Sequence, residues 1–248
     1  MPAEPVYPRP KWPYLKEINV AGTVKETGGD FDYKLMPEGM HAAVCDQVVF
    51  LGKQLTGYAD DKTGEPKVQE KVYLRFEVPK QRLEYTDKQG VAQNRPMTIG
   101  ITVTASLSEK ATLRKYLEAW RAKQFTDLEL KGFDLFNVLG VPCMLTVQHN
   151  TKGDKTYANV TGINRFKAEM EVAGQKITIE EPKAENPLIK FKEGTDDPAD
   201  AESFDKLQEW LQKKIQSQVR EHPAVAGQAE NGGTNFVGGD FVDDDIPF

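Results

Sequence analysis

The chain has 248 residues, and its 39% hydrophobic and 28% charged residues are an ordinary composition for a soluble protein. The longest apolar runs fall far short of the roughly 20 residues of a membrane-spanning helix, and residues 1–20 lack the apolar stretch of a secretory signal. We therefore expect a cytoplasmic protein with no membrane contact. Cys45 and Cys143 stand singly in apolar surroundings, which predicts buried free thiols and no metal site.

Charge is distributed unevenly along the chain. The net charge is −6, yet residues 1–179 hold 25 basic and 22 acidic residues, a net charge of +3. Residues 180–221 carry −4 and residues 222–248 carry −5. A mildly basic body with an acidic end favours a nucleic-acid surface that is kept apart from an interaction segment. The alternative is that +3 is ordinary variation on a solvated surface.

The first part of the chain predicts an extended arm followed by strands. Residues 2–13 contain five prolines, and we assign residues 1–38 to the arm. Residues 39–51 and 67–79 have the composition and alternation of strands. In the second strand, one face is apolar and should meet the core: Val72, Leu74, Phe76 and Val78. The other face should point outward: Lys71, Tyr73, Arg75 and Glu77.

The middle of the chain adds a third strand, helices and a hairpin. A turn at residues 87–90 leads into a strand at 97–105, and a helix should run from its N-cap Ser108 to Gln124. Trp120 and Tyr116 lie on the apolar face of this helix and should join the core. A second helical stretch is predicted over 126–139. Two final strands, 143–149 and 157–165, are joined by a hairpin turn.

The order of three strands, a helix and two strands is that of the OB-fold, a five-stranded barrel that binds oligonucleotides or oligosaccharides. We therefore predict a mainly β protein with an OB-fold-like five-stranded barrel over residues 39–180, its helix lying between strands 3 and 4.

The last part of the chain predicts a connector, a helix and a disordered tail. Residues 181–221 form an acidic connector and an amphipathic helix that begins at Asp197. Its apolar stripe consists of Phe204, Leu207, Leu211, Ile215 and Val219. The stripe can pack on the barrel or join copies of the chain into a homo-oligomer. Residues 222–239 are too poor in large apolar side chains to fold and should be a disordered linker.

The chain ends in a short acidic peptide, residues 240–248, whose last residues are Asp243, Asp244, Asp245, Ile246, Pro247 and Phe248. This ending resembles the acidic tip of the bacterial single-stranded DNA-binding proteins, the SSB family. The Phe248 ring and carboxylate suit a pocket with a basic rim. The alternative is a tail that only improves solubility.

The resemblance implies sequence-independent single-stranded DNA binding in DNA replication, recombination and repair, with a tip that recruits partner proteins of these processes. The body of the chain looks more like that of a bacteriophage-type single-stranded DNA-binding protein. A phage-encoded protein of this kind would work in the cytoplasm of its bacterial host.

Single-stranded DNA binding requires aromatic side chains that stack on bases and cations that meet phosphates. The candidates lie on the outward face of the second strand, in the loops and in the hairpins. They are Tyr73, Arg75, Lys71, Tyr58, Lys62, Tyr85, Lys88, Lys152, Lys155 and Tyr157. The alternative for each tyrosine is a structural role, and for each loop lysine simple solvation.

No motif indicates catalysis. The chain has no phosphate-binding loop, HExxH or GxSxG sequence, and its three histidines are scattered. We therefore expect neither an enzyme nor a bound cofactor or metal. The rival function is an interaction protein that mimics the SSB tip and captures host replication factors without binding DNA.

Overall fold

The computed structural model describes residues 34–59, 64, 66–86, 89–172, 174–194 and 199–220. The contact pattern separates residues 1–33 from residues 34–248, and the description below concerns the second unit. The predicted arm up to residue 33, the helix start at Asp197, the linker and the tip lie outside the described residues. The candidate contacts Lys62 and Lys88 lie outside them as well.

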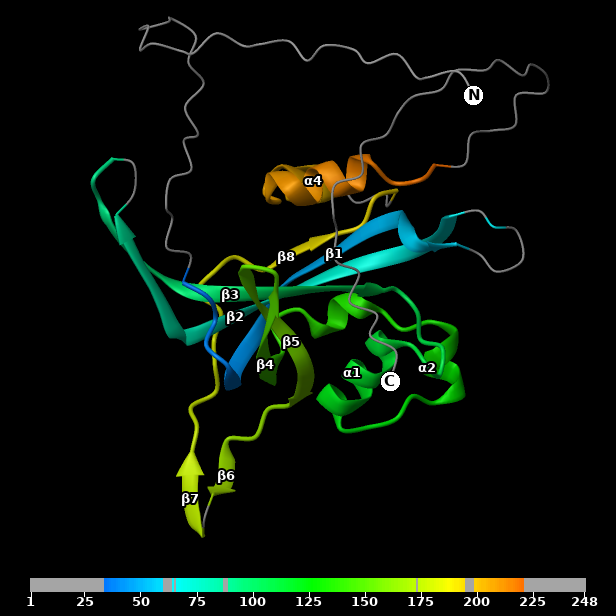
Figure 1. Ribbon diagram of the computed structural model, residues 1–248. Coiled ribbons are helices and arrows are strands. Elements are labelled where there is room, and N and C mark those ends of the chain that lie inside the picture. The colour runs from blue at the N-terminus through cyan, green and yellow to red at the C-terminus, as the bar shows by residue number, and fades with distance from the viewer. Residues whose placement is uncertain are drawn as a thin grey trace, which may run out of the picture. The chain divides into compact units, whose positions relative to one another are not determined.

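The described part is mainly β, as predicted, and is built on one open six-stranded sheet (Figure 1). Five strands follow the order β3-β2-β1-β4-β5, with antiparallel neighbours. They are β1 (Gly39–Ala59), β2 (Pro66–Thr86), β3 (Ala92–Thr104), β4 (Pro142–Lys152) and β5 (Lys155–Arg165). The short strand β8 (Ile189–Phe191) pairs with β1 in parallel. A separate two-stranded sheet contains β6 (Glu169–Val172) and β7 (Gln175–Thr178).

The sheet is not closed by hydrogen bonds within the described residues. Strands β3 and β5, at the two ends of the order, approach within 8 Å between Cα atoms but do not pair. The strands are also longer than predicted, because β1, β2 and β3 run well beyond the core into their hairpins. The predicted order of three strands, a helix and two strands is confirmed.

Three short helices lie between β3 and β4: α1 (Thr112–Arg121), α2 (Asp127–Lys131) and the 3-10 helix η1 (Leu135–Val138). The prediction of Ser108 as an N-cap is wrong, since α1 begins after Ala111, whose N–H donates to the Ser108 carbonyl at 3.0 Å. The stretch predicted over 126–139 is two helices. Thr126 caps α2 in a capping box with Glu129, which satisfies two backbone donors at that end.

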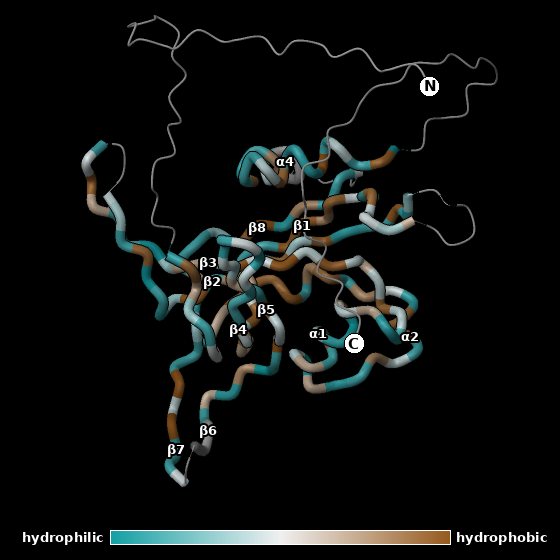
Figure 2. The backbone as a smooth tube through the Cα atoms, in the orientation of Figure 1, coloured by the Kyte–Doolittle hydropathy of each residue, from teal (hydrophilic) through white to brown (hydrophobic). Residues whose placement is uncertain are grey.

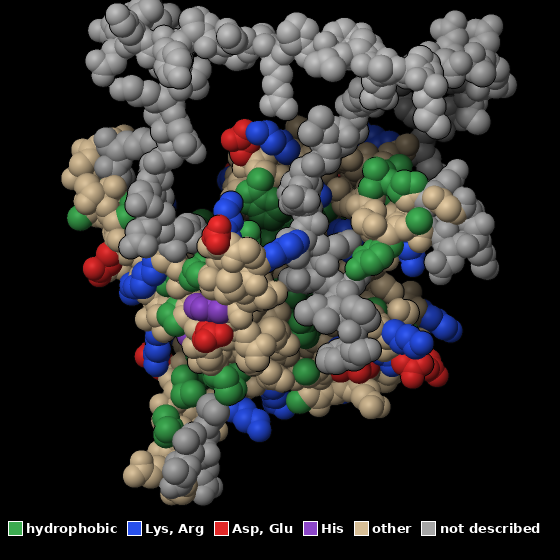
Figure 3. Space-filling view, viewed as in Figure 1, with side chains coloured by type: hydrophobic (Ala, Val, Ile, Leu, Met, Phe, Trp, Pro, Cys, Tyr) green, Lys and Arg blue, Asp and Glu red, His purple; other side chains and the backbone are tan. Residues whose placement is uncertain are grey.

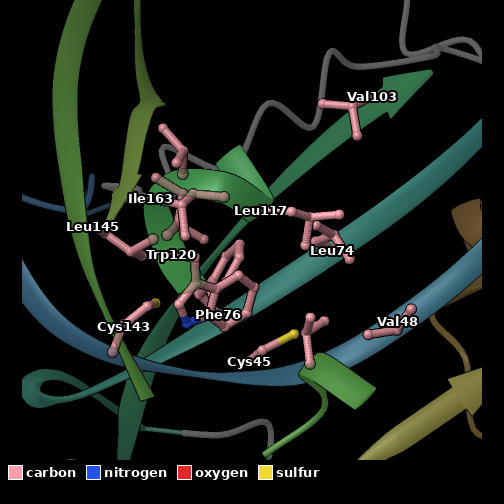
Figure 4. Close-up of a cluster of buried hydrophobic side chains, with 14 of the residues drawn as sticks. Cys45, Val48, Leu74, Phe76, Val103, Leu117, Trp120, Cys143, Leu145 and Ile163 are labelled. Atoms are coloured by element: carbon pink, nitrogen blue, oxygen red, sulfur yellow. The ribbon is translucent and has the colours of Figure 1, made fainter. Parts of the chain in front are cut away.

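The main core lies between the inner face of the strands and α1 (Figure 4). Val72, Leu74, Phe76 and Val78 are all buried there, as their alternation predicted. Trp120 is also buried, and its Nε1 donates to the Pro142 carbonyl at 2.9 Å, while Tyr116 is half-buried against the same core. Burial raises the pKa of both free thiols, so Cys45 and Cys143 act as small apolar side chains in this core.

The C-terminal segment forms a second layer on the outer face of β1 and β2. The single helix predicted there is two helices, α3 (Ala199–Asp205) and α4 (Glu209–Gln216). Leu207, Leu211 and Ile215 of the predicted stripe are buried in a second cluster. Their neighbours in that cluster are Val49, Leu51, Tyr73 and Phe191. The stripe therefore packs on the sheet, and hydrophobic stretches of β1 and β8 lie side by side beneath α4 (Figure 2).

Candidate nucleic-acid interface

The outer face of β2 holds three of the predicted DNA contacts, and none of them is exposed. Tyr73 keeps only 9% of its surface accessible, and its ring meets Trp210 of α4 edge to face at 5.1 Å between centroids. Lys71 is buried too, and its Nζ donates to Thr104 Oγ1 at 3.3 Å. The prediction that these side chains form an open binding face is wrong, because the C-terminal segment covers it.

Arg75, the third of these residues, belongs to a buried ionic network. Its guanidinium donates from Nε and Nη2 to the fully buried Asp46 carboxylate, with the shortest distance at 2.8 Å. Burial raises the pKa of Asp46, and the hydrogen bond from Arg75 opposes that rise. The guanidinium is thus engaged with a protein carboxylate.

Glu77, the next residue on this face of β2, binds the connector that follows β7. Its fully buried carboxylate accepts the backbone N–H groups of Glu185 and Asn186, both at 2.8 Å. A buried carboxylate without such donors would cost several kcal/mol, on the order of 3 or more. The connector therefore supplies the hydrogen bonds that the buried Glu77 carboxylate needs, and this part of the outer face of β2 has a structural role.

The ends of the three main hairpins are exposed, in contrast. Tyr58 of the β1–β2 hairpin is 50% exposed, Tyr85 of the β2–β3 hairpin 39%, and Tyr157 of the β4–β5 hairpin 44%. Arg95 lies over the Tyr85 ring with its Cζ 5.8 Å from the centroid. Lys152 and Lys155 are exposed and face each other in the register of β4 and β5. Each hairpin thus offers an aromatic ring, and exposed cations accompany it, including Lys67 in the β1–β2 hairpin.

The described candidates fall into separate groups. Lys152, Lys155 and Tyr157 share one hairpin, whereas Tyr58 and Tyr85 lie on two others. On the face shown in Figure 3, Lys and Arg side chains occur at several separate places, with Asp and Glu side chains beside some of them. A ligand that met all three hairpins would have to be extended, as a single strand of nucleic acid is.

Sequence reasoning missed three exposed residues of the C-terminal segment. Trp210 of α4 is 47% exposed. Lys190 and Lys192 of β8 lie over the Phe136 and Phe50 rings, at 5.6 and 5.0 Å from the ring centroids. Their alternation with the buried Phe191 was a readable signal for a strand, but a run of three residues is too short to predict one alone.

No cluster of three or more potential metal ligands occurs among the residues that the structure describes. None of the helices in these same ranges is long and apolar enough to cross a bilayer. Comparison of the chain with protein-family models, with curated proteins and with solved structures finds no match.

Proposed function

We propose that the chain is a sequence-independent single-stranded DNA-binding protein of replication, recombination and repair, with an OB-fold-like barrel and a C-terminal tip that recruits partner proteins. One observation carries the proposal for the body of the chain. Each of the three hairpins of the main sheet presents one exposed tyrosine: Tyr58, Tyr85 and Tyr157. Exposed aromatic rings on loops that border a barrel are suited to stacking on bases of any sequence.

The order of the strands supports an OB-like arrangement. Strand β1 pairs with both β2 and β4, and the helices lie between β3 and β4. In OB-folds, the loops between strands 1 and 2 and between strands 4 and 5 border the oligonucleotide. Tyr58 belongs to the first of these connections, and Lys152, Lys155 and Tyr157 belong to the second.

The chemistry proposed for binding is stacking plus phosphate neutralisation. A tyrosine ring that stacks on a base contributes about 1–3 kcal/mol, and this contribution depends little on sequence. Lys152 and Lys155 are exposed cations that can approach phosphates beside Tyr157. The acidic tip, with its Phe248 carboxylate, would bind a basic pocket on a partner protein.

A titration of fluorescent oligo-dT by anisotropy, at two salt concentrations, tests the proposal. We expect micromolar or tighter binding that weakens as salt rises, because bound phosphates displace counterions. The triple variant Y58A/Y85A/Y157A should lose most of this affinity, whereas the exposed Ile177→Ala in β7 should bind like the wild type. A wild-type chain without measurable oligo-dT binding would refute the proposal.

The covered face of β2 favours a second candidate function. Because Tyr73 and Arg75 are occupied within the protein, the body offers less open sheet to DNA than a bare barrel. A chain that captures SSB-tip receptors and binds no DNA fits that feature. The same titration separates the two functions, since this candidate requires receptor binding by the tip without any oligo-dT binding.

A further inference from the structure

Trp210 is an exposed aromatic side chain on an otherwise well-packed layer. It lies in the first turn of α4, one residue before Leu211, which is fully buried against the sheet. The Trp210 and Tyr73 rings are perpendicular, at 89°, and this contact leaves 47% of the tryptophan exposed. Complete burial of an aromatic ring this large would stabilise the fold further. The fold instead leaves nearly half of the Trp210 surface in contact with water.

Trp210 contacts Tyr73, which belongs to a row of residues across β2 and β3. Tyr73 reaches over the neighbouring strand at Gly100, where a Cβ atom would stand only 2.1 Å from the Tyr73 hydroxyl. Thr98 and Thr102, two residues to either side of Gly100, are exposed on β3. Trp210 therefore borders the part of the β2–β3 face that the C-terminal layer leaves open.

Two lysines lie close to Trp210 on the same helix, α4. Lys213 and Lys214 follow Trp210 by three and four residues, so they lie on the same side of α4. Lys213 keeps 70% of its side chain exposed while it pairs with Glu209 at 2.6 Å. A pair this exposed exchanges readily with solvent ions, so the ammonium can move to a phosphate.

We propose that Trp210 stacks on a base of bound single-stranded DNA at the β2–β3 face, with Lys213 beside it at the phosphates. This inference rests on the proposed function and gives the C-terminal layer a part in binding. The layer covers Tyr73 and replaces it, at nearly the same place on the sheet, with a larger ring that is open to solvent. In OB-folds, the face of strands 2 and 3 is where oligonucleotides lie.

Substitutions that separate packing from stacking test the inference in the full-length chain. In oligo-dT anisotropy titrations, W210L keeps an apolar group against Tyr73 but offers no aromatic face, and its affinity should fall about 5- to 100-fold. W210F should retain most of the affinity. The control L128A removes an apolar side chain that is 78% exposed on α2, and it should bind like the wild type.

Tryptophan fluorescence provides a second measurement that does not depend on W210L folding. The chain has three tryptophans, and Trp120 is buried in the core. Oligo-dT should quench the emission of W12F, while W12F/W210F, which emits from Trp120 alone, should show no quenching. Quenching that persists in the double variant, or wild-type affinity in W210L, would overturn the role of Trp210. A wild type that does not bind oligo-dT would instead overturn the proposed function itself.

Discussion

The outer face of β2 and the ends of the hairpins carry the same kinds of residues in opposite environments. Tyr73 and Arg75 are held under the C-terminal layer, one against Trp210 and the other against Asp46. Tyr58, Tyr85 and Tyr157 stand in solvent. A tyrosine or arginine on a strand therefore indicates a ligand contact only after the rest of the chain has been placed around it.

Charged residues also have different roles in the two regions. At the covered face, Asp46 and Glu77 are fully buried, and each is matched by donors from elsewhere in the fold. At the β4–β5 hairpin, Lys152 and Lys155 are exposed and can meet a ligand. We expect substitutions at the first site to change the free energy of unfolding, and substitutions at the second to change DNA affinity.

The largest effect should come from removing a buried carboxylate at the covered face. In D46A, the Arg75 guanidinium loses its buried partner, so the free energy of unfolding should fall by about 3–5 kcal/mol. Urea denaturation followed by circular dichroism measures this loss. The surface pair Glu209–Lys213 gives the control, and K213A should unfold at the wild-type urea concentration. An unchanged midpoint for D46A would mean that the outer face is as open as the hairpins.

Sequence alone predicts which side of a strand a residue faces, but not what covers that side. The alternation from Val72 to Val78 identified the core face correctly, and the turn residues placed the hairpins. The cover depends on contacts between distant parts of the chain, such as Glu77 with Glu185 and Gln54 with Lys214. A two-residue period carries no information about these contacts. The apolar stripe at Leu207, Leu211 and Ile215 showed that some surface must be covered, but not which one.

The contact of Phe248 with partner proteins should be independent of both regions. Deleting Phe248 should weaken binding to receptors of the SSB tip by about 2 kcal/mol or more, since the ring and the terminal carboxylate enter one pocket together. Calorimetry with a peptide of residues 240–248 against a tip-binding helicase or nuclease measures this loss. The deletion should leave oligo-dT affinity and the urea midpoint as they are. Equal affinity of the intact and shortened peptides would leave only a solubilising tail.

The G100A substitution tests the contact between Tyr73 and Trp210. In G100A, the new Cβ would overlap the Tyr73 ring, which must then move together with its Trp210 contact. We expect a loss of about 1–3 kcal/mol in the free energy of unfolding, as overpacking typically costs. G57A is the matched control in β1, because a Cβ there meets nothing within 4 Å. Equal stability of the two variants would show that the Tyr73 side chain relocates freely.

The smallest effect should be competition between the acidic tail and DNA at the hairpin ends. Residues 240–248 carry four aspartates and no basic residue. Their removal should raise oligo-dT affinity by less than about 1 kcal/mol near 10 mM salt, where screening extends over roughly 30 Å. At about 150 mM salt, screening falls to roughly 8 Å, and the gain should disappear.

The location of this competition follows from the contrast between the two regions. If the tail competes for exposed cations, the gain should shrink in K152Q/K155Q, which removes the two exposed cations of the β4–β5 hairpin. It should persist in R75Q, because the Arg75 guanidinium is already bound by Asp46 and is closed to the tail. Anisotropy titrations of each variant, with and without residues 240–248, provide the comparison. A gain that is lost in R75Q but kept in K152Q/K155Q would mean that the tail and DNA meet at the covered part of β2 around Arg75, and that the C-terminal layer lifts off this part of the sheet in solution.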